Sequence, residues 1–195
     1  PQRKHGRDAG AAQLLLAILA NILEEQIAED RHHPGRQHLV EDVDVADHHP
    51  SEPYTAAISM HVTMNIADKP TWYRAIADRL SNGGQLVVWD ICATGREELP
   101  LPLPWSIDGS DNFIVQPAEL HDAITDSGFD TVEWVDEGAW VREWFDTTFA
   151  NGLPSGPGIA MLLDDGFTRT INIGAAQAAD SITIMRGRFT KRATS

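Results

Sequence analysis

Two groups of side chains that could do chemistry each stand at the end of an apolar run. Ser59, Met60 and His61 end the run TAAISMH, and Asp90 lies near the end of the run QLVVWDI. An imidazole with its ordinary pKa can accept a proton near neutral pH. A carboxylate can hold an amine or a hydroxyl through hydrogen bonds. Placed side by side, these residues could orient a small polar ligand and take a proton from it.

The pattern around these residues predicts the elements that position them. Residues 55–61 and 85–91 are apolar enough to be strands covered on both faces, and residues 67–80 have helical spacing. Asp68 is a suitable cap for that helix, and the SNGG sequence at 81–84 ends it. Two strands joined by a helix form a βαβ unit, whose ligands lie at the carboxyl ends of its strands. We therefore expect Ser59–His61 and Asp90 to lie close together.

The rest of the chain continues the alternation of strands and helices. The loop 93–110 contains three prolines and is too irregular to be an element, and a loop of that length after a strand is often functional. This alternation predicts an α/β fold. The further elements that we expect are helices at 116–129 and 139–150, strands at 130–136 and 181–190, and helical structure in two parts across 159–180.

The first 53 residues differ from everything after them and contain six of the eight histidines. Residues 11–27 (AAQLLLAILANILEEQI) carry an apolar stripe at helical spacing, which predicts an amphipathic helix. A secretory signal peptide is the alternative, but Glu24 and Glu25 follow the apolar run and no A-x-A-like cleavage site is present. We therefore treat residues 1–53 as an atypical segment made of a helix and a loop.

Residues 32–49 combine five histidines with three aspartates, and such side chains could bind zinc or another divalent ion. However, the segment has no H-E-x-x-H motif on a helix and no fixed spacing of metal ligands. We therefore favour a solvated loop around a short strand at 39–45 and predict no metal site.

Composition excludes several classes of partner. The chain has 195 residues, 42% of them apolar, and a net charge of −14, which argues against binding to nucleic acid or to an anionic membrane surface. Cys92 is the single cysteine, so an internal disulfide is impossible and a reducing, cytoplasmic location is expected. No apolar run approaches the roughly 20 residues of a membrane helix. The sequence does not indicate an oligomeric state.

Residues 54–190 resemble a class I S-adenosylmethionine-dependent methyltransferase of the sarcosine/dimethylglycine or ubiquinone-methylase-like groups. The matching text is AAISMHVTMNIADKPTWYRAIADRLSNGGQLVVWDI, with Asn82 in place of the usual proline before the glycine pair. Pro104-Trp105, the helix start QPAEL, Ser127-Gly128-Phe129 and a final strand follow in the expected order. The resemblance implies a Rossmann-like methyltransferase sheet that binds S-adenosylmethionine.

The resemblance also implies roles for single residues. Ser59, Met60 and His61 would border the methionine end of the cofactor, with His61 as a general base or a hydrogen-bond partner of the acceptor. Asp44, or Asp42, would be the acid that contacts adenine. A second set would bind the substrate: Asp90, Trp105 and Phe113. Each role has a structural alternative, namely a strand cap for His61, a turn ligand for Asp90, and ordinary core for the two aromatic side chains.

One departure from the family pattern affects the function that we expect. The family holds its cofactor on a glycine-rich turn after the first strand, and Gly6, Gly10 and Gly35 do not follow an apolar strand. We therefore expect residues 54–195 to be the carboxyl-terminal part of a methyltransferase domain, with the sheet incomplete in its amino-terminal half. A truncated gene or a shifted reading frame would explain the change in composition near residue 50.

Two functions remain open on the sequence. The first is methyl transfer to the amine, hydroxyl or carbon of a small molecule. The alternative is an inactive, truncated methyltransferase-like fragment that does not bind the cofactor. A nicotinamide-dependent reductase is disfavoured, because neither tyrosine begins a Tyr-x-x-x-Lys motif: Ile58 follows Tyr54 at that spacing, and Ala77 follows Tyr73.

Overall fold

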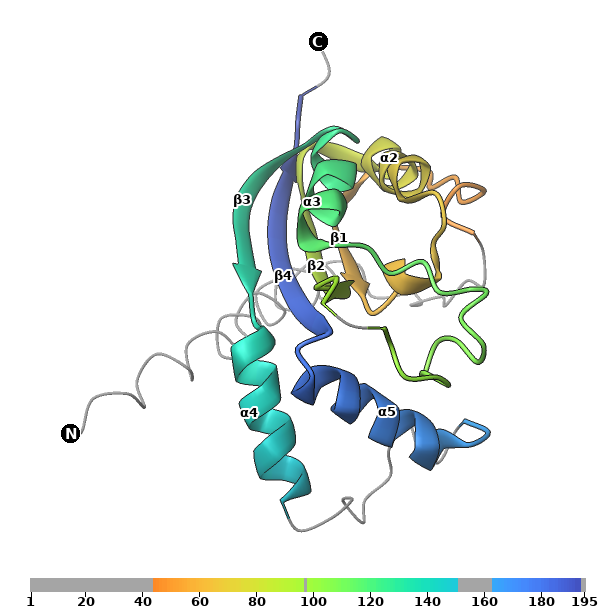
Figure 1. The fold of residues 1–195 in the computed structure, drawn as a ribbon. Coiled ribbons are helices and arrows are strands. Elements are labelled where there is room, and N and C mark those ends of the chain that lie inside the picture. The colour runs from red at the N-terminus through yellow and green to blue at the C-terminus, as the bar shows by residue number, and fades with distance from the viewer. Residues whose placement is uncertain (1–43, 97, 151–162, 194–195) are drawn as a thin grey trace, which may run out of the picture. The chain divides into compact units, whose positions relative to one another are not determined.

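The computed structural model describes residues 44–96, 98–150 and 163–193. These residues form one four-stranded sheet with the strand order β1-β2-β4-β3 (Figure 1). The elements in chain order are β1 (Tyr54–Met60), the 3-10 helix η1 (Thr63–Asn65), α2 (Lys69–Arg79), β2 (Leu80–Ala93), α3 (Pro117–Thr125), β3 (Phe129–Asp136), α4 (Gly138–Phe149), α5 (Gly166–Ala178) and β4 (Ile182–Lys191). Within the described residues β1 has β2 as its one neighbour and forms an edge of the sheet.

The predicted βαβ unit is confirmed, because β1 and β2 are parallel neighbours joined by α2. Asp68 caps α2 by accepting a hydrogen bond from the Thr71 N–H at 3.0 Å, as the sequence indicates. Gly83 has the positive φ of 78° that the change of direction after the helix requires. The predicted turn at 81–84 is wrong in one respect, since β2 already begins at Leu80.

The third and fourth places in the sheet are filled by antiparallel strands. The final strand β4 pairs with β2 on one side and with β3 on the other. Gly187 of β4 lies under the rings of Trp134 and Phe189, which stand 5.7 Å apart between their centroids. A side chain at residue 187 would occupy the space of these rings, so the close packing there depends on glycine.

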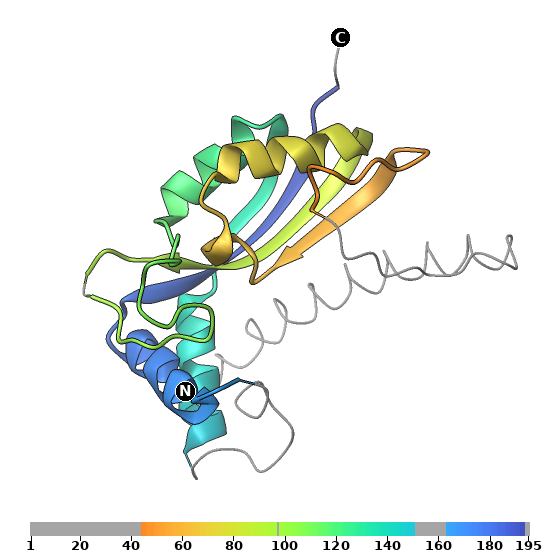
Figure 2. The same ribbon diagram turned by 90° about the vertical axis from the view of Figure 1, so that its right-hand side faces the viewer.

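Figure 2 shows α2 and α3 over one face of the sheet and α4 and α5 on the other side. Buried apolar side chains form two cores with these elements. The central strand β2 is therefore buried along most of its length, which explains its continuous apolar run, whereas most residues of β1 and β3 are exposed or half-buried. The first core contains Tyr73, Ile76, Leu86, Val88, Leu120, Ile124, Phe129 and Phe189, among others. The second contains Met64, Ile91, Val141, Ala176, Ile182 and Ile184.

Other predictions need correction or lie outside the described residues. A strand was predicted at 39–45, and up to residue 47 in the version that gives Asp44 the contact with adenine. Residues 44–47 form a turn instead. The helix at 11–27 and the first helical part of 159–180, up to residue 162, lie outside the described residues. No helix among the residues that the structure describes is both long enough and apolar enough to cross a membrane.

Candidate functional site

The strand β1 ends beside Trp89, four residues before β2 ends at Ala93, so Ser59–His61 and Asp90 lie close together, as the sequence predicts. Met60 pairs with Trp89 in the parallel register, and the His61 N–H donates to the Trp89 carbonyl at 2.9 Å. His61 then leaves the strand with a positive φ of 52°, a conformation that L-residues adopt rarely. Met60 is 44% exposed, whereas Ser59 is 2% exposed. The end of β1 thus presents Met60 and His61 to solvent and turns Ser59 inward.

The Asp90 carboxylate is fully buried and is used by the backbone of the turn after β1. One oxygen, Oδ2, accepts from the N–H of Thr63 at 2.9 Å and from that of Val62 at 3.2 Å. The other oxygen accepts from the N–H of Ile91 at 3.0 Å. This geometry matches the alternative role of a turn ligand, and the carboxylate is not exposed to a substrate. Asp90 holds the turn that begins at His61.

The surroundings of His61 favour the neutral form of its imidazole. The side chain is exposed, but neighbouring protein removes part of its water. This desolvation lowers the pKa of His61 below its ordinary value, and the nearby Asp90 carboxylate opposes the shift to a lesser degree. The neutral form of the ring is therefore favoured, and protonation requires a more acidic solution than for a free imidazole.

Lys69 is a buried cation at the site to which the sequence assigned no role. Its ammonium group donates to the carbonyl of Ile66 at 2.8 Å and to the carbonyl of Phe113, and the residue is only 4% exposed. Burial lowers the pKa of Lys69, and the negative field of Asp90 acts against that shift. The helix dipole disfavours a lysine in the first turn of a helix. The position of Lys69 in the sequence could therefore have indicated that its ammonium group has a partner in another element.

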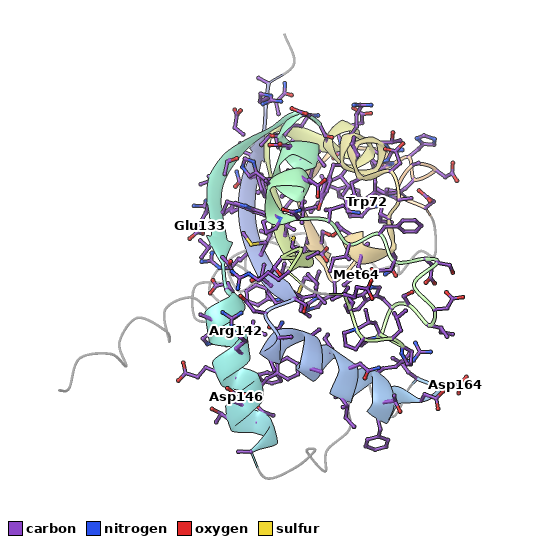
Figure 3. All side chains as sticks on the ribbon, in the orientation of Figure 1. Met64, Trp72, Glu133, Arg142, Asp146 and Asp164 are labelled. Carbon is purple, nitrogen blue, oxygen red and sulfur yellow. The ribbon has the colours of Figure 1, made fainter. Side chains whose placement is uncertain are left out.

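The two aromatic residues assigned to the substrate lie in the loop that follows β2. Phe113 is 36% exposed, and its N–H donates to the Met64 carbonyl at 2.9 Å, which joins this loop to the turn after β1. The Trp105 indole N–H donates to Asn112 Oδ1 at 2.9 Å, and its ring packs against the second core. Figure 3 labels Met64, which lies among side chains between the sheet and this loop. The backbone of Phe113 is therefore joined to the turn that begins at His61, and Trp105 is partly a core residue.

A buried polar group lies beneath the site, between the strands and α2. Burial raises the pKa of the Tyr73 hydroxyl well above its ordinary value, and burial likewise raises the pKa of the Cys92 thiol. Ser59 lies near Tyr73, but neither hydroxyl reaches a partner with full hydrogen-bond geometry among the described residues. Burial thus favours the protonated forms of the Tyr73 hydroxyl and the Cys92 thiol.

Asp44 is not brought to the strand ends. It lies in a turn, where Asp44 Oδ1 accepts from the Ala46 N–H at 2.8 Å. The Ala46 carbonyl in turn accepts from Arg79 at 2.6 Å, at the carboxyl end of α2. His61 lies near the other end of that helix, whose 11 residues span about 16 Å. The structure therefore places Asp44 apart from Ser59, Met60 and His61.

A groove of about 590 Å³ lies next to this turn, along the outer side of α2. It does not include the strand ends, so this groove and the residues Ser59, Met60, His61 and Asp90 are in different places. The described residues also contain no group of three histidine, cysteine or acidic side chains that could hold a metal ion. The residues that line the groove are Ala46, His48, His49, Pro50, Pro53, Thr71, Arg74, Ala75, Asp78 and Arg79.

Comparison with known proteins identifies the fold. No protein-family model matches the chain, and no curated protein sequence matches it. Among solved structures, the chain is similar to the O-methyltransferase of a trans-AT polyketide synthase multienzyme from Brevibacillus brevis, in complex with S-adenosyl-L-homocysteine. The two share 16% identity over 87% of this chain and 54% of that one, with a TM-score of 0.58.

Two further similarities show how varied the chemistry of this fold is. The geranyl diphosphate C-methyltransferase of Streptomyces coelicolor A3(2) is 16% identical over 74% of this chain and 51% of its own, with a TM-score of 0.52. The [4+2]-cyclase SpnF is 17% identical over 86% and 61%, with a TM-score of 0.55. The expected Rossmann-like methyltransferase fold is thus confirmed, and the chain spans about half the length of the structures that it matches.

Proposed function

We propose that the ends of β1 and β2 form one wall of a methyl-transfer site that takes S-adenosylmethionine and a small-molecule acceptor. The observation that carries the proposal is the pairing of Met60 with Trp89, which sets His61 beside the end of β2 in an exposed position. The fold similarity supports methyl transfer in general. The finer assignment to the sarcosine/dimethylglycine or ubiquinone-methylase-like groups rests on sequence resemblance.

The described residues fit one side of the cofactor. Met60 and His61 are exposed where a sulfonium group would meet its acceptor, whereas Ser59 faces the core. The described residues do not contain a glycine-rich turn that follows a strand and opens a helix, which is the usual cradle for the rest of such a ligand. The cofactor supplies an activated methyl group, so the protein mainly has to align the acceptor with it.

In this proposal His61 accepts the proton that the acceptor loses. Because desolvation lowers the pKa of His61, the base form is present at neutral pH and is lost only in more acidic solution. Phe113 would cover the acceptor, while Asp90 acts on the turn and not on the acceptor. The net charge of −14 favours a neutral or cationic acceptor, whose reacting atom is an amine, a hydroxyl or a carbon.

Calorimetric titration of the purified chain with S-adenosylmethionine tests the proposal. We expect saturable binding, and in a preparation that transfers methyl groups His61→Ala should lower turnover more than it weakens cofactor binding. His121 is the control, because it lies on α3 and contacts Thr131, so His121→Ala should change neither quantity. Turnover should fall in acid with a midpoint below the ordinary histidine pKa. Unchanged turnover in His61→Ala would remove this residue from the mechanism.

The second candidate function is a methyltransferase-like fragment without cofactor binding. It is favoured by one observation, namely that the chain spans about half the length of the structures it matches. The same titration decides between the two. Absence of saturable binding at about 1 mM ligand, where association is weaker than about −4 kcal/mol, would support the fragment and refute the enzyme for this chain.

A further inference from the structure

The turn after β1 is held at both ends by buried charges. At its start the Asp90 carboxylate accepts the N–H groups of Val62 and Thr63. At its end the Lys69 ammonium group donates to the Ile66 carbonyl. Asp90 is 0% exposed and Lys69 is 4% exposed. The short helix η1 therefore has a negative group at its amino end and a positive group at its carboxyl end, which is the order that the helix dipole favours.

The same lysine also reaches a second loop. Its ammonium group donates to the carbonyl of Phe113, and the N–H of Phe113 donates to the carbonyl of Met64 in η1. The loop after β1 and the loop after β2 are thus joined through one cation and one backbone hydrogen bond. His61 stands at the start of the first loop and Phe113 at the end of the second.

A lysine at residue 69 is destabilising unless its ammonium group makes hydrogen bonds that an apolar side chain cannot make. Burial of an ammonium group costs free energy, and the dipole of α2 opposes a cation in its first turn. Its stem could be replaced by an apolar side chain of the same length, but the carbonyls of Ile66 and Phe113 would then lose this donor. The charge of Asp90 would lose its buried counterpart as well.

We propose that Lys69 and Asp90 are positioning residues that fix His61 and Phe113 relative to each other by holding the backbone of both loops. Their role in catalysis rests on the proposed function of methyl transfer. Neither side chain touches the acceptor, since both are buried behind the turn. Asp90 sets where His61 leaves the strand, and Lys69 sets how far Phe113 stands from it.

Hydrogen exchange measured by mass spectrometry on the full chain tests this proposal. In Lys69→Met, we expect exchange in peptides covering residues 61–66 and 111–115 to rise at least about tenfold, as the loss of a hydrogen bond from a charged donor implies. Exchange in β2 and β4 should stay the same. Lys191→Met is the matched control, because Lys191 also donates to a buried carbonyl, that of Leu80 at 2.6 Å, at the opposite end of the sheet. It should leave both loop peptides unchanged.

A second variant gives a readout that a general loss of stability would not produce. Because the charge of Asp90 raises the pKa of His61, Asp90→Asn should shift the NMR titration of the His61 ring to lower pH. Unchanged loop exchange in Lys69→Met, or an equal rise throughout the sheet, would overturn the proposal. An unshifted His61 titration would overturn the part that concerns Asp90.

The proposal also predicts a property of the unaltered chain, so it can be tested even if a variant fails to fold. The amides of Val62 and Thr63 lie in a turn, yet their bonds to Asp90 should protect them from exchange as strongly as amides of β2. Exchange of these two amides at the rate of an unstructured peptide would refute the proposal. None of these measurements requires the cofactor, so their failure is distinguishable from a failure of methyl transfer.

Discussion

Replacement of Arg186 by methionine should destabilise the protein by about 3–5 kcal/mol, because it strands a buried carboxylate. The Arg186 side chain is 5% exposed and donates through Nε to Glu137 at 2.8 Å and through a terminal nitrogen to Glu133 at 2.7 Å. The Glu137 side chain is 7% exposed and cannot easily be rehydrated, whereas that of Glu133 is 27% exposed and can be. Glu133 is labelled on β3 in Figure 3. Methionine keeps most of the stem volume, so the loss comes from the charge.

The magnitude follows from the two bonds and the burial. Each hydrogen bond to a charged group contributes about 1.5–3 kcal/mol, and the partner that remains buried adds its own desolvation cost. Urea unfolding followed by circular dichroism measures the change. With a slope of about 2 kcal/mol per molar, which lies within the usual range, the midpoint should fall by roughly 2 M.

Arg142→Met is the matched control for this prediction. Arg142 and Asp180 are 34% and 31% exposed at their side chains, and their ion pair of 2.8 Å should contribute only about 0–1 kcal/mol. Asp180 also keeps its second partner, Arg96. The double variant Arg186→Met with Glu137→Gln should be more stable than Arg186→Met alone, by about 1 kcal/mol or more, because no buried charge is left at residue 137. Equal losses in Arg186→Met and Arg142→Met, or a double variant no more stable than the single one, would refute the reasoning.

Two smaller predictions concern packing and the single thiol. A Cβ at residue 187 would overlap the Phe189 ring and lie 2.7 Å from the Trp134 ring, so Gly187→Ala should cost about 1–3 kcal/mol in urea unfolding. Gly174→Ala in α5 is its control, since a Cβ there meets nothing within 4 Å, and it should stabilise by about 0.5–1 kcal/mol. Cys92 is 0% exposed and burial raises its pKa, so Ellman's reagent should modify the folded protein at least about tenfold more slowly than the protein in urea. Equal rates in the two conditions would show that the thiol is accessible in the folded state.

The order of elements could be predicted because its signals are local. Asp68 before an apolar periodic run, the glycine pair after it, and the continuous apolar segment of β2 each specify their own element. The final strand was predicted from alternation, and its antiparallel insertion between β2 and β3 was not. Strand order depends on contacts between residues far apart in the chain, which a local pattern does not contain.

The chemistry of single side chains was harder to predict than the fold. Asp90 at a strand end looks like a ligand for a substrate, yet its oxygens accept N–H groups from a turn about 27 residues earlier in the sequence. Arg186 and Arg188 alternate with other residues along β4, a spacing that is also typical of a solvent-exposed face. The Arg186 side chain is nevertheless buried and pairs with two glutamates. In both cases the partner comes from another element, so the sequence alone could not show that the charge was already satisfied.

The pleat of β1 limits how the segment Ser59-Met60-His61 can meet a ligand. Successive side chains of a strand point to opposite faces, so Ser59 and Met60 cannot both contact one small molecule through their side chains. Ser59 is 2% exposed on the face covered by α2, and Met60 is 44% exposed on the other. His61 follows neither face, because its positive φ turns the chain away from the strand after one last hydrogen bond to Trp89. A ligand at the strand end therefore meets His61 and Met60, while Ser59 contributes to the core that holds them.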